Sequence, residues 1–141
     1  MTPPNVKQLQ LMEGWSEIDP KMRVRFDFPL QAAAGTKTTA VVYFEIEPGE
    51  RLARHTDSAE EILYVVEGSG EAEVGGERVP IEAGSLAVVP ELVPHGVRNT
   101  GDSTLKVVGF FSAAELEHVF EEPLQPLGVT VVHTPFVPAA V

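Results

Sequence analysis

"PGERLARHTDSAEEILYVVEG", residues 48–68, places ionisable side chains, which are usually exposed, next to an apolar segment, which is usually buried. His55, Asp57 and two glutamates stand within seven residues, directly before the apolar run from Ile62 to Val66. Burying carboxylates and imidazoles costs free energy unless they are hydrogen-bonded, paired or bound to a metal. We therefore expect this stretch to carry polar groups to a site that uses them.

The apolar run in this stretch predicts a β-strand, because it is β-branched and reaches Gly68 within a strand's length. Ser58 and Glu61 have capping-box spacing, but the run that follows does not fit a helix. In extended chain His55 and Asp57 project from one face. Glu61 joins them if the chain stays extended, and a turn at residues 58–59 would break the phase. Glu60 then becomes a solvated edge charge.

A second unusual stretch, "VVPELVPHGVRN" (residues 88–99), sets His95 between apolar segments punctuated by proline. Imidazole and carboxylate together suit Fe, Mn, Ni, Co, Cu or Zn, and two histidines with one carboxylate leave positions open for a substrate. His95 would supply its nitrogen from a different strand, as a site between two sheets requires.

The rest of the chain favours an all-β fold. Twelve glycines and twelve prolines divide 141 residues into short β-branched and aromatic runs. Turn signals such as "VGGE" separate them, which indicates antiparallel hairpins in a small β-barrel or sandwich. The predicted strands are "MRVRFDF" (22–28), "TTAVVYFEIE" (38–47), "ILYVVE" (62–67), "EAEV" (71–74), "ERVPI" (77–81), "LAVVP" (86–90), "HGVRN" (95–99) and "TLKVVGFF" (104–111).

One domain spanning residues 1–141 fits this length. Its barrel core is expected over about 36–112, with an N-terminal arm (1–20) and a C-terminal segment (113–141). In that last segment Ser112 and Glu115 have capping-box spacing, which favours one short helix over "AAELEHVF"; a strand over 116–120 is the alternative. His118 and His133 lie outside any motif and are interpreted as surface or packing residues.

Composition excludes several classes of partner. The net charge of −11 disfavours nucleic acid and anionic membrane surfaces. The absence of cysteine removes disulfides and sulfur-ligated metals. No apolar run approaches the roughly 20 residues of a membrane span, and no export signal is visible at the N-terminus. We therefore expect a cytoplasmic protein with no membrane partner.

The two stretches resemble the paired motifs of the cupin family. The first has Gly49, His55, Glu61 and Gly68 at the family's spacing, with Asp57 where cupins have a second histidine. The second has Gly84, Pro90, His95 and Asn99 at the family's spacing, with Leu92 where cupins have glycine. The gap between the motifs, residues 69–83, also agrees.

The resemblance implies a small antiparallel β-barrel (jelly roll), usually dimeric, with one divalent metal inside. Carried over by position, the metal ligands are His55, Glu61 and His95, with Asp57 in the fourth place. Asp57 could bind the metal, accept a hydrogen bond from bound water or leave the position empty. A slip that pairs Ala53 with His55 also keeps two histidines. Two carboxylates tilt the preference among Fe, Mn, Ni, Co and Zn toward Mn or Fe.

Function stays open between two classes. One is a metal-dependent enzyme of oxygenase or isomerase type acting on a small organic molecule, with Asp57 or Glu61 as candidate general base. The other is a non-catalytic module that binds a small ligand with a degenerate or empty metal site. Val41 and Tyr43 on the outer face of strand 38–47 predict a homodimer, because a monomer would leave them wet.

Overall fold

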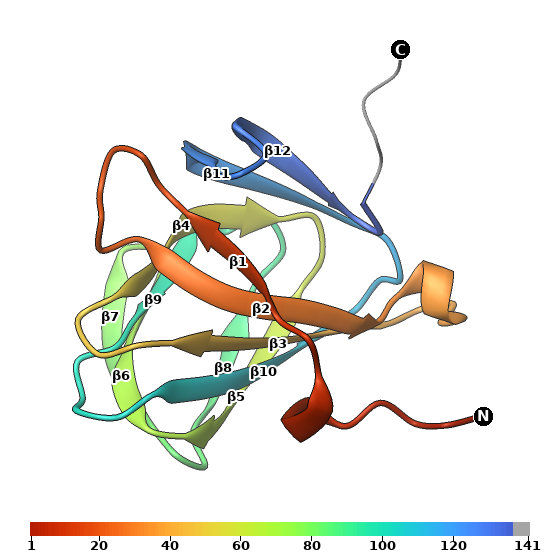
Figure 1. The fold of residues 1–141 in the computed structure, drawn as a ribbon, viewed down its shortest axis with the longest axis horizontal. Helices are drawn as coiled ribbons and strands as arrows, with labels where there is room; N and C mark the ends of the chain where they lie inside the picture. Colours follow the sequence, from red (N-terminus) through yellow and green to blue (C-terminus); the bar gives the residue numbers. More distant parts are fainter. Residues whose placement is uncertain (137–141) are drawn as a thin grey trace.

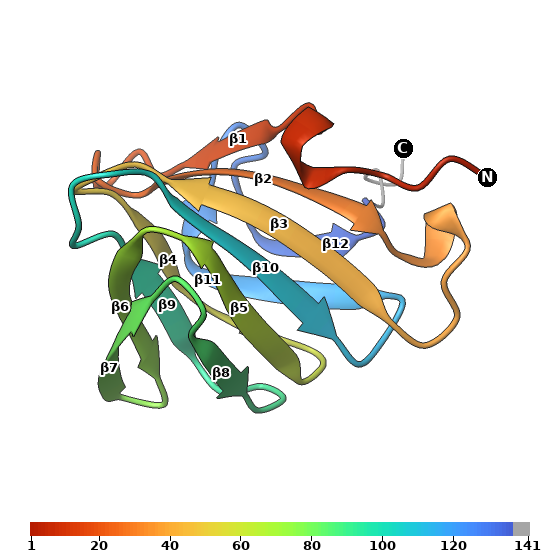
Figure 2. The ribbon, with the colours of Figure 1, turned by 90° about the horizontal axis from the view of Figure 1, so that it is seen from below.

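The computed structural model of the chain describes residues 1–136, and these fold into two six-stranded antiparallel sheets (Figures 1 and 2). The first sheet has the order β1-β2-β3-β10-β5-β8 and the second β12-β11-β4-β9-β6-β7. The strands are β1 (Met12–Trp15), β2 (Arg23–Leu30), β3 (Ala40–Ile46), β4 (Arg51–Asp57), β5 (Glu61–Glu67), β6 (Ser69–Val74), β7 (Glu77–Glu82), β8 (Leu86–Val89), β9 (His95–Arg98), β10 (Leu105–Phe111), β11 (Leu116–Leu124) and β12 (Val129–Thr134). The predicted all-β barrel is confirmed.

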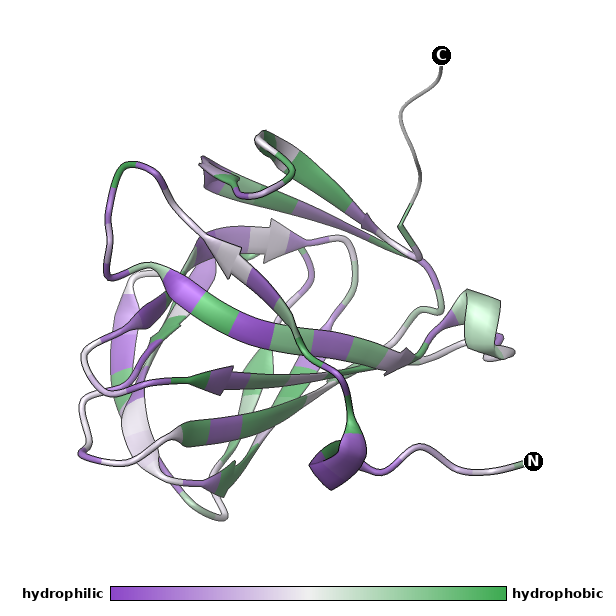
Figure 3. Ribbon diagram, viewed as in Figure 1, coloured by the Kyte–Doolittle hydropathy of each residue, from purple (hydrophilic) through white to green (hydrophobic). Residues whose placement is uncertain are grey.

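Alternation along the strands fills the space between the sheets. Figure 3 shows hydrophilic and hydrophobic residues alternating along β2. In β3 the side chains of Val42, Phe44 and Ile46 are buried on the inner face, as the period-two pattern predicted. Each of the eight predicted strand segments overlaps an observed strand. The core therefore lies between the two sheets, and a site there must be lined by inward-facing residues.

The helix predicted after Ser112 is wrong, and the strand alternative is confirmed. Residues 116–124 form β11, in which buried Leu116 and His118 alternate with exposed neighbours. Pairing with β4 on one side and β12 on the other satisfies the backbone groups of this segment, which outweighs the local capping signal. Within residues 1–136 the only helical turns are 3₁₀ turns at Val6–Gln8 and Ala32–Ala34, and no helix there is long and apolar enough to cross a membrane.

Both ends of the chain contribute strands beyond residues 36–112. Part of the predicted N-terminal arm is the strand β1, which pairs antiparallel with β2. The hairpin of β11 and β12 adds two strands to the second sheet, next to β4 (Figure 1). Residues 137–141 of the predicted C-terminal segment lie outside the described residues. The C-terminal hairpin matters because β11 reaches the interior of the barrel.

Two motif positions lie in turns where the backbone has a positive φ. Gly68 has a φ of +89°, and a Cβ there would lie 2.7 Å from the carbonyl oxygen of Thr104, so only glycine fits. Leu92, which stands where cupins have glycine, has a φ of +62° and is the single non-glycine residue with positive φ among the described residues. The turn at Leu92 therefore keeps the left-handed conformation that glycine would adopt without strain, at a cost of roughly 1 kcal/mol for the leucine.

The outer face of the first sheet differs from what the sequence predicted. Tyr43, expected to be wet, is 3% exposed within one chain, and its hydroxyl donates to Glu45 Oε2 at 2.5 Å. The interpretation that a monomer leaves Tyr43 in water is therefore wrong. Exposed apolar side chains do gather on the same sheet, farther along: Ile62 and Tyr64 of β5, Leu86 and Val88 of β8, and Phe110 of β10.

Candidate metal centre

Two buried histidines meet because β4 pairs with β9. The register places His55 opposite His95, and cross-strand neighbours on one face lie within side-chain contact. The two imidazole rings are 4.2 Å apart between centroids, and both side chains are buried. Segments forty residues apart in the sequence therefore converge inside the barrel, as the paired motifs predicted.

Both imidazoles are held with the same nitrogen facing the interior. Nδ1 of His55 lies 2.7 Å from the carbonyl oxygen of Ala53, and Nδ1 of His95 lies 3.0 Å from that of Val93. A carbonyl oxygen only accepts, so each Nδ1 carries the proton and donates it. This leaves each Nε2 turned into the cavity, which is the arrangement that metal-binding histidines adopt.

Asp57 completes a cluster of three donors. One nitrogen each of His55 and His95 and one carboxylate oxygen of Asp57 lie within 4.8 Å of one another. His95 Nε2 is 3.1 Å from Asp57 Oδ2, yet both atoms are buried without a hydrogen-bond partner. Buried polar atoms that lack partners are rare and costly. A divalent cation between them would satisfy both, so the residues present fit a metal ion.

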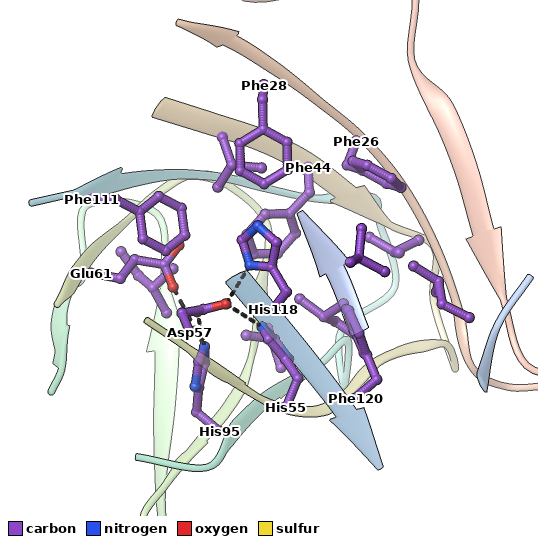
Figure 4. A pocket seen from close by; sticks show the side chains of 17 residues that line it. Phe26, Phe28, Phe44, His55, Asp57, Glu61, His95, Phe111, His118 and Phe120 are labelled. Atoms are coloured by element: carbon purple, nitrogen blue, oxygen red, sulfur yellow. Dashed lines mark hydrogen bonds and ion pairs between the residues drawn. The ribbon is translucent and has the colours of Figure 1, made fainter. Parts of the chain in front are cut away.

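Glu61 faces this cluster from the opposite sheet. Its Oε1 lies 3.5 Å from His95 Nε2, and its side chain is buried (Figure 4). The space it occupies depends on Gly109 of β10, because an added Cβ at that position would overlap with Glu61 Oε2. The turn between β4 and β5 breaks the strand at residues 58–60, but Glu61 still points inward and Glu60 is exposed, as predicted.

A third buried histidine belongs to the site. β11 pairs with β4 so that His118 stands opposite Asp57, and His118 Nδ1 donates to Asp57 Oδ1 at 2.6 Å. On the other side of the ring, His118 Nε2 lies 2.9 Å from the hydroxyl oxygen of Thr134. In the neutral imidazole Nε2 accepts the hydroxyl proton. Both nitrogens are therefore engaged, and His118 orients the Asp57 carboxylate (Figure 4).

The electrostatics of the four central groups follow from burial and from each other. Burial lowers the pKa of His55 to about 4, so this ring is neutral. Burial alone would lower the pKa of His95, but the carboxylates of Asp57 and Glu61 raise it to about 10. Burial also opposes ionisation of Asp57, yet His118 and His95 hold its pKa well below the usual range. Burial raises the pKa of Glu61.

Aromatic side chains make up much of the wall around this centre. The ring of Phe120 stacks on His55 at 4.8 Å, and Phe28 lies 5.3 Å from His118. The chamber has a volume of about 70 Å³. Its lining contains no lysine or arginine among the described residues. The phenylalanines and the polar groups that line it are Phe26, Phe28, Phe44, Phe111, Phe120, His55, Asp57, Glu61, His95 and His118.

The structure brings all four predicted site residues into one chamber and adds His118. His118, interpreted as a surface or packing residue, is buried and hydrogen-bonded to Asp57, so that interpretation missed its contact with the site, whereas His133 is on the surface as predicted. Alternation in residues 116–120 carried a signal, since Leu116, His118 and Phe120 share one strand face. The alternation does not reveal which strand pairs with β11. Only the pairing with β4 brings His118 next to Asp57.

Comparison with known proteins agrees with this geometry. Residues 42–111 match the model of the cupin domain. A protein described as polyketide synthase CurC from Streptomyces cyaneus is 38% identical over 64 residues, which cover 45% of this chain and 42% of that protein. The match thus spans less than half of that relative's length.

Solved structures show the same fold. The polyketide cyclase RemF from Streptomyces resistomycificus superposes with a TM-score of 0.64 at 17% identity, over 79% of this chain and 78% of that one. Lactobacillus farciminis oxalate decarboxylase in a formate complex gives 0.70 at 20% identity, over 82% of this chain and 34% of that one. With the paired motifs and the domain match, the shared barrel identifies this chain as a member of the cupin family.

Proposed function

We propose that this cupin is a metal-dependent enzyme that moves a proton next to a carbonyl group of an aromatic, largely uncharged small molecule. The observation that carries the proposal is the chamber itself. Imidazoles and carboxylates stand in a wall of phenylalanine and aliphatic side chains, with no lysine or arginine among its described lining residues. Aromatic walls with a few polar anchors suit an aromatic ligand.

The relatives support the choice between two kinds of substrate. One similar protein and one similar structure are named for polyketide chemistry, and another structure is an oxalate decarboxylase. Oxalate is a small dianion, and it would meet Asp57 and Glu61 here without an arginine or lysine to offset their charge. A polyketide-like aromatic carbonyl compound is neutral and matches the walls.

The cation belongs at His55, His95 and Asp57, whose donor atoms lie within 4.8 Å of one another. A set of two imidazoles and one carboxylate fits Mn, Fe, Ni, Co or Zn, and the second carboxylate nearby favours Mn or Fe. When bound, such a cation polarises the carbonyl oxygen of the ligand. Asp57 stays ionised because His118 holds its carboxylate.

Glu61 is the proton carrier in this proposal. It lies outside the three-donor cluster, comes from the opposite sheet and turns Oε1 toward the centre. That oxygen takes the proton from the carbon next to the substrate carbonyl and returns it to the product. Burial raises the pKa of Glu61, which makes it a better proton acceptor near neutral pH.

Deuterium exchange tests this proposal directly. Metal-loaded protein is incubated in D₂O with acetophenone, and deuteration of the methyl group is followed by NMR. We expect exchange well above the rate of buffer with the same metal, and loss of that exchange in Glu61→Gln with the metal retained. Exchange equal to the buffer rate contradicts the proposed reaction.

Metal analysis separates the enzyme from the alternative, a module that only binds a ligand. Protein purified without added metal should contain a near-stoichiometric transition metal, and a chelator should lower its melting temperature, because an ion that binds only the folded state stabilises it. A metal-free preparation with a melting temperature indifferent to chelators and to added metals favours the ligand-binding module.

We also propose a homodimer formed through the outer face of the first sheet. The exposed side chains there belong to paired strands, with Ile62 opposite Val88 and Tyr64 opposite Leu86. A contiguous exposed apolar face of this kind is typical of an interface. Sedimentation at micromolar concentration should give twice the chain mass of 15.2 kDa, and Leu86→Glu with Val88→Glu should give the monomer. A wild-type monomer contradicts the dimer.

A further inference from the structure

A second, larger cavity borders the chamber and shares four of its lining residues. An outer groove of about 560 Å³ runs between β1 and β2 on one side and the end of the β11–β12 hairpin on the other. Phe26, Phe28, Leu124 and Val132 line both spaces, so these four side chains form a collar between the chamber and the groove. A molecule in the groove therefore contacts the same four side chains as a molecule in the chamber.

The two volumes limit what can reach the centre. The chamber, with about 70 Å³, is smaller than the roughly 150 Å³ in which an engineered apolar cavity binds benzene. It has room for a cation and a few atoms of a ligand. The groove, with about 560 Å³, is in the range of roughly 300–1,000 Å³ that small-molecule sites occupy. The bulk of a ligand fits only the groove.

The lining of the groove defines the ligand further. Met12, Leu127 and Pro126 present apolar surface, and the ionisable side chains among the described lining residues are Asp27, His133 and Glu13, the last of which is paired with Arg23. No lysine or arginine lines it within residues 1–136. An anionic tail would therefore be repelled, and an uncharged apolar tail would be accepted.

We infer that the substrate is a two-part molecule: a carbonyl head of a few atoms enters the chamber, and an elongated, uncharged aromatic tail lies in the outer groove. This inference rests on the proposed function for the identity of the head group. The groove then limits the length of the substrate tail. The collar of Phe26, Phe28, Leu124 and Val132 lies between the reacting atoms in the chamber and the tail in the groove.

Calorimetric titration of metal-loaded protein with three probes tests this division of the site. Acetophenone has one ring, 4-acetylbiphenyl adds a second ring in line, and 4′-acetylbiphenyl-4-carboxylate adds a charge at the far end. We expect 4-acetylbiphenyl to bind at least tenfold more tightly than acetophenone, and the carboxylate to bind at least tenfold more weakly than 4-acetylbiphenyl. The readout is binding alone, so absence of deuterium exchange leaves this test intact.

Matched variants locate the tail. Met12→Asp and Leu127→Asp change exposed groove residues and should abolish the advantage of 4-acetylbiphenyl over acetophenone. Val131→Asp is the control, because Val131 is equally exposed but alternates with the groove residue Val132. Equal affinities of the two neutral probes overturn the inference. So does a Val131→Asp variant that behaves like Leu127→Asp, or a chain dimer that Leu127→Asp dissociates without changing probe affinity.

Discussion

Three buried histidines lie in the second sheet: His55 in β4, His95 in β9 and His118 in β11. The hydrogen bonds of the first two differ from those of the third. In His55 and His95 the chain's own backbone carbonyls hold Nδ1, and Nε2 faces the cavity without a hydrogen bond. In His118 both nitrogens are engaged, one by Asp57 and the other by Thr134. The same side chain thus presents an unengaged nitrogen to the proposed metal site in two places and supports a carboxylate in the third.

Burial alone does not identify a metal ligand. All three rings are at least nine-tenths buried, and each lines the same chamber. What separates them is the atom that remains free after the hydrogen bonds are counted. His55 keeps a free lone pair on Nε2, and His95 gains one when a cation displaces its proton, whereas His118 has none left in its neutral form. The predictions below test this distinction.

The largest effect is expected from removing a donor. His95→Ala should weaken metal binding by more than about 100-fold, because it removes a direct ligand. The fold should persist, since the packing of the sheets rather than the ion holds the barrel together. Metal content after gel filtration and a thermal melt measure both. His133→Ala on the surface is the control, and full metal content in His95→Ala would show that the ligand assignment is wrong.

A smaller loss is expected from removing the support. His118→Gln should weaken metal binding by about 10- to 100-fold while keeping an ion at saturating concentrations, because Asp57 loses the group that orients it. Competition with a coloured chelator measures the affinity. A loss as complete as that of His95→Ala would make His118 a ligand, and an unchanged affinity would remove it from the site. Either outcome contradicts a supporting role for His118.

Competition between a proton and the metal ion tests whether His95 is a metal ligand. In the metal-free protein the neighbouring carboxylates raise the pKa of His95 to about 10, so the ring is protonated at neutral pH. A cation must displace that proton, and affinity should therefore rise about tenfold per pH unit between about pH 6 and pH 8. His55, with a pKa of about 4, is already neutral and adds nothing. Calorimetry in two buffers counts the released protons, and a pH-independent affinity contradicts the assignment.

The smallest effect on the metal is expected at Gly109. In Gly109→Ala the new methyl group would overlap with Glu61 Oε2 and displace that carboxylate. Metal affinity should change by no more than about threefold, since the three donors are untouched, but deuterium exchange should fall at least about tenfold if Glu61 moves the proton. Gly101→Ala is unsuitable as a control because it is also crowded, whereas Gly76→Ala, at a φ of +84°, meets nothing within 4 Å and so reports backbone strain without displacing Glu61. Unchanged exchange in Gly109→Ala would argue against Glu61 as proton carrier.

Much of the fold could be predicted because local patterns determine it. β-branched runs between turn residues predicted eight strands, and alternation in β3 predicted the inner face of Val42, Phe44 and Ile46. The paired motifs predicted that His55 and His95 converge, since their spacing is typical of a single barrel. The capping signal at Ser112 misled because pairing with β4 and β12 is stronger than one cap.

By itself, then, the sequence determined an all-β cupin barrel with imidazoles and carboxylates inside it, because side-chain alternation and motif spacing are properties of neighbouring residues. The tertiary structure decided which of those groups meet and what each has left to offer. Strand order places β11 beside β4 and so brings His118 to Asp57. The space left by Gly109 for Glu61, and the collar between chamber and groove, depend on contacts between strands far apart in the chain, which no local pattern encodes.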